Sequence, residues 1–119
     1  MANRTISKTS KFETVTTTDG STVLFKTFDI ADRFVDFEVT IMADEIDDEP
    51  TSGKVQKKYV TFRNGAIFDD GVLRTNPLHL PGGITFDANA GIGRFYITGP
   101  GAGVTVEWDV IFDITERFR

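Results

Sequence analysis

The sequence predicts an all-β protein, an antiparallel two-sheet β-sandwich with about eight or nine strands. Polar and apolar side chains alternate over 33–43 and again over 104–114, which is the two-residue period of a strand with one buried face. Turn-forming residue pairs recur at short intervals between such segments. No stretch keeps the 3.6-residue period of an amphipathic helix. Jelly-roll connections are one form that a sandwich of this kind can take.

The segments expected to form strands follow one another between these turns. They are 11–18, 22–30, 33–43, 55–64, 66–69, 72–75, 78–80, 84–87, 92–98 and 104–114. Asp19-Gly20, Asn64-Gly65 and Asp70-Gly71 are expected to be hairpin-type turns, because such pairs tolerate the positive φ that tight hairpins need. The run Gly99–Gly103 is expected to be a tight hairpin turn. Residues 1–11 are expected to be an extended N-terminal arm, and residues 12–119 a single sandwich domain.

The composition indicates a dry, well-packed core. Of 119 residues, 39% are apolar and 26% charged, which is typical of a globular domain. Phenylalanine occurs 11 times, against two tyrosines and one tryptophan. A buried phenyl ring needs no hydrogen-bond partner. The same bias disfavours a sugar-stacking platform of exposed tryptophan or tyrosine side chains.

The charge distribution argues against several kinds of partner. The net charge is −5, and residues 12–116 carry all 18 acidic residues but only eight basic ones. An acidic body repels phosphate backbones, so we expect no nucleic-acid partner. No apolar run is long enough to span a bilayer, and residues 1–5 lack the apolar core of a secretory signal. The absence of cysteine excludes disulfides and thiolate metal sites.

The residues that nucleophilic catalysis needs are scarce. His79 is the only histidine, and it stands between two leucines. The serines lie in the expected arm or in turns; they are Ser7, Ser10, Ser21 and Ser52. A triad needs a base close to its nucleophile, and a lone histidine of this kind is more often structural. We therefore expect that the chain is not an enzyme and that it has no cofactor.

Two sets of carboxylates have alternative interpretations. Asp36 with Glu38, and Glu107 with Asp109, share a strand face at a spacing that glycosidases could use. The solvent face of any acidic β protein has the same pattern. The acidic run Asp44–Glu49 could bind calcium, form an inter-subunit salt-bridge patch, or be a solvated loop. Its spacing does not match an EF-hand, so we expect no metal site.

The basic residues gather at the ends of the chain. Arg4, Lys8 and Lys11 lie in the expected arm, which has no acidic residue, and Arg117 and Arg119 end the sequence. Such ends could reach the acidic surface of a neighbour or of a second copy. The alternative interpretation is that they are solvated, frayed termini.

The C-terminal elements resemble those of a known group of domains. A strand ending in Phe95-Tyr-Ile-Thr-Gly99 leads through small residues to Val104-Thr-Val-Glu-Trp108. This order resembles the small β-sandwich domains of tailed-bacteriophage virion proteins, found in capsid decoration (cement) proteins and tail fibres. The Thr-rich segment 14–18 and Asp32-Arg33-Phe34-Val35 echo the start of such domains.

The resemblance implies a virion structural protein, assembled in the host cytoplasm. The main function that it implies is capsid decoration. The protein would then be a homotrimer that binds the major capsid protein or another virion protein. Arg4, Lys8, Lys11 and Phe12 are then the expected partner-binding residues, because an arm without structure can order on docking. The alternative is a receptor- or carbohydrate-binding module of a tail fibre, with Tyr59 and Tyr96 as its exposed aromatic residues.

Overall fold

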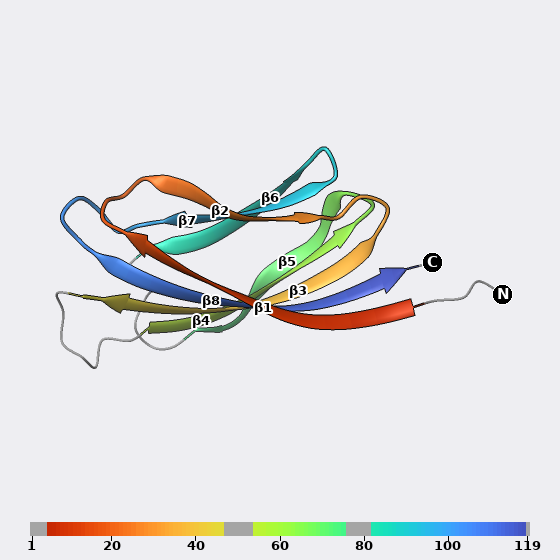
Figure 1. Ribbon diagram of the computed structural model, residues 1–119, viewed down its shortest axis with the longest axis horizontal. Coiled ribbons are helices and arrows are strands. Elements are labelled where there is room, and N and C mark those ends of the chain that lie inside the picture. Colours follow the sequence, from red (N-terminus) through yellow and green to blue (C-terminus); the bar gives the residue numbers. More distant parts are fainter. Residues whose placement is uncertain (1–4, 47–53, 76–81, 119) are drawn as a thin grey trace.

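The structure is a computed structural model that describes residues 5–46, 54–75 and 82–118. This part of the chain consists of strands and the turns between them (Figure 1). The eight strands are β1 (Thr5–Thr17), β2 (Thr22–Asp29), β3 (Phe34–Glu45), β4 (Lys54–Arg63), β5 (Ala66–Thr75), β6 (Gly83–Asn89), β7 (Ile92–Thr98) and β8 (Val106–Phe118). No helix in these residues could cross a membrane.

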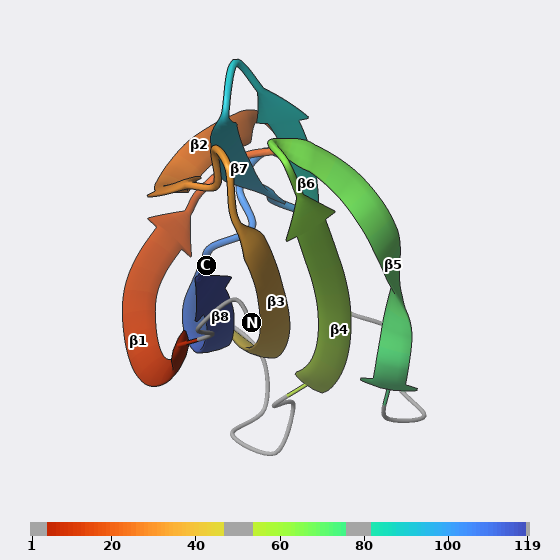
Figure 2. The ribbon, with the colours of Figure 1, turned by 90° about the vertical axis from the view of Figure 1, so that its right-hand side faces the viewer.

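The strands form two antiparallel sheets that face each other (Figure 2). The larger sheet has the order β1-β8-β3-β4-β5, and the smaller one the order β2-β7-β6. The predicted all-β sandwich is thereby confirmed. β1 pairs with β8 in the larger sheet, and β2 pairs with β7 in the smaller one. The first and last strands of a jelly roll pair in the same way. The connections then depart from that form, because β3, β4 and β5 are consecutive neighbours in one sheet.

Alternation along β3 and β8 places one face of each strand in the core. These are the strands whose sequence pattern is most regular, and they pair with each other at the centre of the larger sheet. Facing them are side chains of β6 and β7. The buried apolar side chains are Ile30, Val35, Phe37, Val39, Ile41, Ala43, Val60, Phe62, Ile84, Phe95, Ile97, Val106, Trp108, Val110, Phe112 and Ile114.

A cluster of phenyl rings joins the two sheets. Phe95 of β7 lies at its centre, with ring centroids 5.3 Å from Phe37 and 5.0 Å from Phe112 of the larger sheet. Phe28 and Phe86, from β2 and β6, also contact the Phe95 ring. The phenylalanine-rich composition therefore fills the interior, where edge-to-face ring pairs add to the energy of burial.

Lysine side chains connect the sheets along both sides of the sandwich. On one side, Lys26 Nζ of β2 lies 2.7 Å from a carboxylate oxygen of Glu13 in β1. On the other, Lys58 Nζ of β4 donates to the carbonyl oxygen of Ile84 in β6, at 2.7 Å. Partial burial lowers the pKa of Lys58 from its usual range. Both sides thus have a charge-assisted contact between layers.

The expectation of an N-terminal arm is wrong for residues 5–11. They form the first half of β1 and pair with β8 in an unbroken register from Thr5↔Phe118 to Thr17↔Val106. Threonine-rich segments favour strands, and β8 supplies a partner that is distant in sequence. Residues 1–4 lie outside the described part of the chain.

The expected turn at Asp70-Gly71 is also wrong. Both residues lie inside β5, where Asp70 pairs with Val60 and Gly71 with Tyr59. A Cβ atom at Gly71 would lie 2.8 Å from Cε1 of Tyr59. The glycine therefore makes room for the tyrosine ring instead of reversing the chain. The expected strand 78–80 lies outside the described residues.

Tight hairpins occur at two positions in the described chain. Asn64 and Gly65 have φ of 53° and 80° between β4 and β5, which confirms the predicted turn, and Ala90-Gly91 is similar between β6 and β7. The segments at Asp19-Gly20 and Gly99–Gly103 are not hairpins, because each connects one sheet to the other. These two connections pack together: a Cβ at Gly20 would lie 3.4 Å from the Cα of Gly101.

Candidate interaction surfaces

The outer face of the larger sheet carries the exposed phenylalanines Phe12, Phe34 and Phe68 together with several charged side chains. Its residues alternate with the core positions of each strand, so pairing in the sheet sets which of them are neighbours. Phe34 of β3 lies between Arg117 of β8 and Arg63 of β4. Further along, Asp36 is opposite Thr115, and Glu38 is opposite Asp113.

Arginine and phenylalanine side chains gather at one end of this face. The Arg117 guanidinium lies 5.8 Å from the Phe34 ring centroid, and that of Arg63 lies 5.6 Å from the Phe68 ring centroid. The two rings are 6.3 Å apart in an edge-to-face arrangement. Phe34 is 38% exposed and Phe68 is 54% exposed. We call these four residues the Arg–Phe surface.

The local backbone explains why Phe68 reaches this surface. The register of β5 against β4 shifts between the pairs Thr61↔Asp69 and Phe62↔Ile67, so Phe68 is an extra residue at a β-bulge. Its ring contacts Phe34 and Arg63 on the outer face. An open depression of about 300 Å³ adjoins the Arg–Phe surface, lined by Asp32, Arg33, Phe34, Arg63, Asn64 and Arg117.

The arginines of this depression have different environments. Arg33 has carboxylates of Glu116 at 3.3 Å and Asp29 at 3.5 Å. Within the described residues, Arg63 and Arg117 have aromatic rings as neighbours but no carboxylate within 4.0 Å. Stacking uses the flat face of a guanidinium, while its N–H donors point outward in the plane. The N–H donors of Arg63 and Arg117 are therefore not occupied by a carboxylate of the described residues.

Sequence reasoning did not identify the Arg–Phe surface. The available signal is two pairs of adjacent apolar residues, Phe34-Val35 and Ile67-Phe68. Neighbouring side chains on a strand face opposite ways, so one member of such a pair faces outward. Without the register, however, neither pair indicates which arginines lie beside it.

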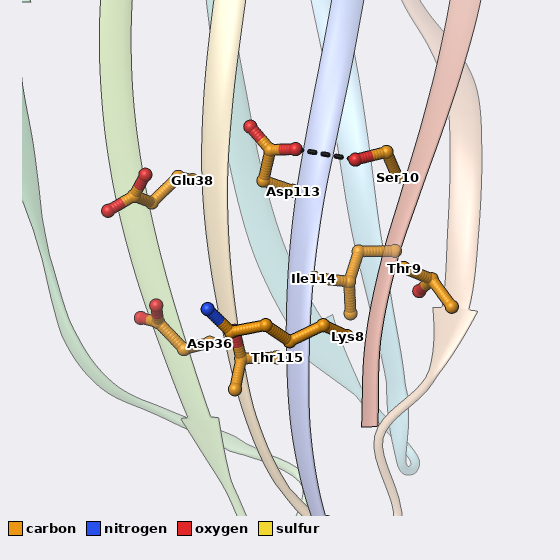
Figure 3. A pocket seen from close by; sticks show the side chains of 8 residues that line it. All are labelled: Lys8, Thr9, Ser10, Asp36, Glu38, Asp113, Ile114 and Thr115. Atoms are coloured by element: carbon orange, nitrogen blue, oxygen red, sulfur yellow. Dashed lines mark hydrogen bonds between the residues drawn. The ribbon is translucent and has the colours of Figure 1, made fainter. Parts of the chain in front are cut away.

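An acidic depression of about 360 Å³ lies beside β1 on the same face (Figure 3). Each of its carboxylates has a partner on a neighbouring strand. Asp113 accepts from Ser10 at 2.7 Å, Asp36 accepts from Thr61 at 2.8 Å, and Glu38 lies 3.2 Å from Lys57 Nζ. Figure 3 shows the Lys8 side chain extending toward Asp36. The arrangement is that of a polar sheet face with cross-strand pairs.

The other carboxylate candidates lie elsewhere. Asp109 accepts from Thr14 at 3.0 Å on the outer face of β8, beside Glu107 two residues earlier. Asp44 and Glu45 end β3, and the rest of the acidic run lies outside the described residues. The described part of the chain contains no group of three or more possible metal ligands.

The residues considered for nucleophilic catalysis are not brought together. Ser7 and Ser10 lie in β1, and Ser21 donates to Asp19 in the connection to β2. Those hydrogen bonds lower the pKa of Asp19. His79 and Ser52 lie outside the described residues. That the chain is not an enzyme stays a prediction.

The partner-binding residues expected in the arm are on strand β1, apart from Arg4, which lies outside the described residues. Lys8 lines the acidic depression. Phe12 is 78% exposed and stands opposite Ile111 of β8. Phe12 and Ile111 line a further depression together with Met42 of β3. Lys11 belongs to the other face of β1, because successive side chains alternate.

The two tyrosines lie on different sheets and do not form one aromatic platform. Tyr59 of β4 packs over Gly71, and its hydroxyl is 3.4 Å from Asp69. Tyr96 of β7 belongs to the smaller sheet, where its hydroxyl lies 3.2 Å from Asp87. Partial burial raises the pKa of both tyrosines.

Asp87 and Arg94 form a two-pronged ion pair between β6 and β7. Arg94 Nε donates to Asp87 at 2.6 Å and Arg94 Nη2 donates at 2.9 Å. These hydrogen bonds hold the pKa of Asp87 below its usual range. A charge-assisted pair of this geometry fixes the register of the hairpin.

We predict that Asp87→Asn destabilises the fold at neutral pH but not in acid. Because the pKa of Asp87 is lower in the folded chain than in the unfolded one, its contribution is complete above the unfolded-state value of about 4. It is lost as the pH falls through the folded-state value. The urea midpoint should decrease relative to the wild type at about pH 7, and the difference should shrink as the pH falls through the folded-state pKa of Asp87. Glu107→Gln, which removes a charge opposite Asp44, should not decrease the midpoint; an equal decrease for both variants would contradict this assignment.

Comparisons with known proteins give a fold likeness. No protein-family model and no curated protein matches the sequence. Among solved structures, the tailspike protein of Acinetobacter baumannii phage AM24 is similar, with a TM-score of 0.46 and 11% sequence identity. The match covers 90% of this chain and 26% of the tailspike, so the chain spans about a quarter of that protein's length. The likeness concerns the arrangement of a small two-sheet β domain.

Proposed function

We propose that this chain is a structural module of a phage tail and that it acts by binding another virion protein through the Arg–Phe surface. The virion context rests on the resemblance of 95–108 to phage β-sandwich domains. The observation that carries the binding proposal is the set of four side chains Phe34, Arg63, Phe68 and Arg117.

The composition of this surface is that of a protein interface. Arginine and aromatic residues are enriched at interface centres, where a few of them dominate the binding energy. Here the rings and guanidinium groups contact one another before any partner binds. Less side-chain entropy is lost on binding when the side chains are already ordered.

The chemistry of the surface indicates an acidic partner. The planar fork of Arg63 or Arg117 can bind a carboxylate through two parallel hydrogen bonds. The exposed rings of Phe34 and Phe68 supply apolar area beside them. The partner surface should therefore combine aspartate or glutamate with apolar side chains.

The pairing of β1 with β8 argues against arm-mediated capsid decoration. The decoration mechanism needs a free segment with Lys8, Lys11 and Phe12, but these residues pair with β8. Carbohydrate binding through Tyr59 and Tyr96 is not proposed either, because the two lie on different sheets. The structure does not test the trimer that the resemblance implies.

The test is a charge reversal in the phage that encodes the chain. Arg63→Glu combined with Arg117→Glu should decrease the amount of the chain in purified virions by tenfold or more. The amount is measured by quantitative mass spectrometry against a tail protein, and a thermal melt confirms folding.

Thr27→Glu with Thr85→Glu is the control, since it adds acidic groups to exposed positions of the smaller sheet. It should leave incorporation unchanged. Full incorporation of the arginine variant would refute the Arg–Phe surface as the contact. Absence of the wild-type chain from virions would refute the virion role itself.

A further inference from the structure

The two sheets end in four edge strands, and these edges differ. β5 has two register shifts, β2 has one, and β6 is only seven residues long. β1 is 13 residues long and pairs with β8 without a shift. Bulges, short lengths and charged side chains, above all lysine, are the usual means of preventing an edge from pairing with another strand. Of the edges in the described chain, β1 is the one with neither a bulge nor a short length, and its charges, which include Lys11 and Glu13, are of both signs.

We propose that two copies of this chain associate through antiparallel pairing of their β1 strands, around a twofold axis at Phe12. The two larger sheets then form one continuous sheet across the axis. This inference does not depend on the proposed function, because the edge of β1 exists in any context.

The charges of β1 select this register. With the axis at Phe12, residue 11 of one copy faces residue 13 of the other, so Lys11 meets Glu13 on both sides of the axis. An axis at Lys11 or at Glu13 would place two like charges opposite each other. Opposite charges in a cross-strand pair stabilise a sheet and like charges destabilise it. The neighbouring registers are therefore disfavoured.

The ion pair already present at Glu13 is compatible with this arrangement. Lys26 Nζ lies 2.7 Å from one Glu13 oxygen, and the Glu13 side chain remains 35% exposed. A carboxylate has two oxygens and can accept from two cations. In the dimer, Glu13 would lie between Lys26 of its own chain and Lys11 of the second copy.

The outer face supplies apolar contact at the same axis. Phe12 is 78% exposed and stands opposite Ile111 in β8, with Met42 lining the same depression. In the proposed register, Phe12 meets its own symmetry mate. The apolar depressions of the two copies then join across the axis. Ser10 faces Thr14 of the second copy, so hydroxyl groups flank the rings.

The first measurement is the mass of the full chain in solution by sedimentation equilibrium over a range of concentrations. A dimer is expected to form as the concentration rises. Lys11→Glu should weaken it at least tenfold, because two carboxylates then face each other on each side of the axis. A persistent monomer, a trimer, or equal association of the variant would overturn the proposal.

The second measurement determines the register by disulfide formation. The chain contains no cysteine, so no native thiol competes with the introduced ones. Phe12→Cys should cross-link readily under mild oxidation, since the two residues face each other at the axis. Ser10→Cys alone should not cross-link, whereas its mixture with Thr14→Cys should. Cross-linking of Ser10→Cys alone, or failure of Phe12→Cys, would exclude this register. Addition of a strand from a different protein to β1 would leave all three samples without cross-links.

Discussion

Phe95→Ala should cause a large loss of stability. The ring is fully buried, and its centroid lies within 6.4 Å of the ring centroids of Phe28, Phe37, Phe62, Phe86 and Phe112. These rings belong to both sheets, so the cavity would form at the centre of the sandwich. A phenylalanine truncation of this kind costs about 3–5 kcal/mol. Native domains are stable by only about 5–15 kcal/mol in total.

Urea denaturation and thermal melting measure this effect. Phe68→Ala is the matched control, because the same side chain is removed from a site that is 54% exposed. Its cost should be less than half that of Phe95→Ala. Equal losses for the two variants would contradict a core centred on Phe95.

Gly99→Ala is expected to have the second largest effect. Although one methyl group is small, a Cβ at this position would press on the carbonyl oxygen of Asp19 and lie 2.9 Å from Thr17 Oγ1. Thr17 is buried and accepts a hydrogen bond from Trp108 Nε1 at 2.9 Å. The two connections between the sheets would have to separate. Overpacking costs about 1–3 kcal/mol, and an unsatisfied indole N–H adds about as much again.

Gly83→Ala provides the control for this substitution. A Cβ at Gly83 would meet no atom within 4 Å, so the change should alter the stability by no more than about 0.5 kcal/mol. Both free energies of unfolding come from urea titrations, and Trp108 fluorescence reports on the packing beside Thr17. If Gly99→Ala were as mild as Gly83→Ala, the close packing of the two connections would be wrong.

The local pattern of the sequence was sufficient for the strands at the centre of the larger sheet. β3 and β8 are buried on one face and solvated on the other, so their alternation is regular and predicts which residues face the core. Their ends were less predictable: β3 continues to Glu45, and β8 begins at Val106 and continues to Phe118. Asn64-Gly65 was predictable for a similar reason, because a tight turn needs positive φ at two adjacent positions. Both are features that a short segment determines by itself.

The errors arose where a distant segment decides the conformation. Residues 5–11 are polar except for Ile6 and have no alternating apolar pattern, and only their pairing with β8 marks them as β. Gly71 is a strand residue because the ring of Tyr59 occupies the space above it. Likewise, nothing local distinguishes the turn at Asn64-Gly65 from the connection at Asp19-Gly20, which leads to the other sheet.

The Arg–Phe surface depends on the register of neighbouring strands even more than the strand bounds do. Phe34 belongs to β3 and Phe68 to β5, and β4 lies between these two strands in the sheet. A bulge brings the Phe68 ring to Phe34 and Arg63. The sequence could indicate that one residue of each apolar pair faces outward. It could not indicate that both would meet two arginines from different strands.

An electron cryomicroscopy reconstruction of the virion that encodes this chain is the most direct test of the proposed function. Density for the domain is expected in the tail, with Phe34, Arg63, Phe68 and Arg117 against an acidic surface of another virion protein. A domain whose Arg–Phe surface faces solvent, or virions whose tails lack the chain, would contradict this proposal.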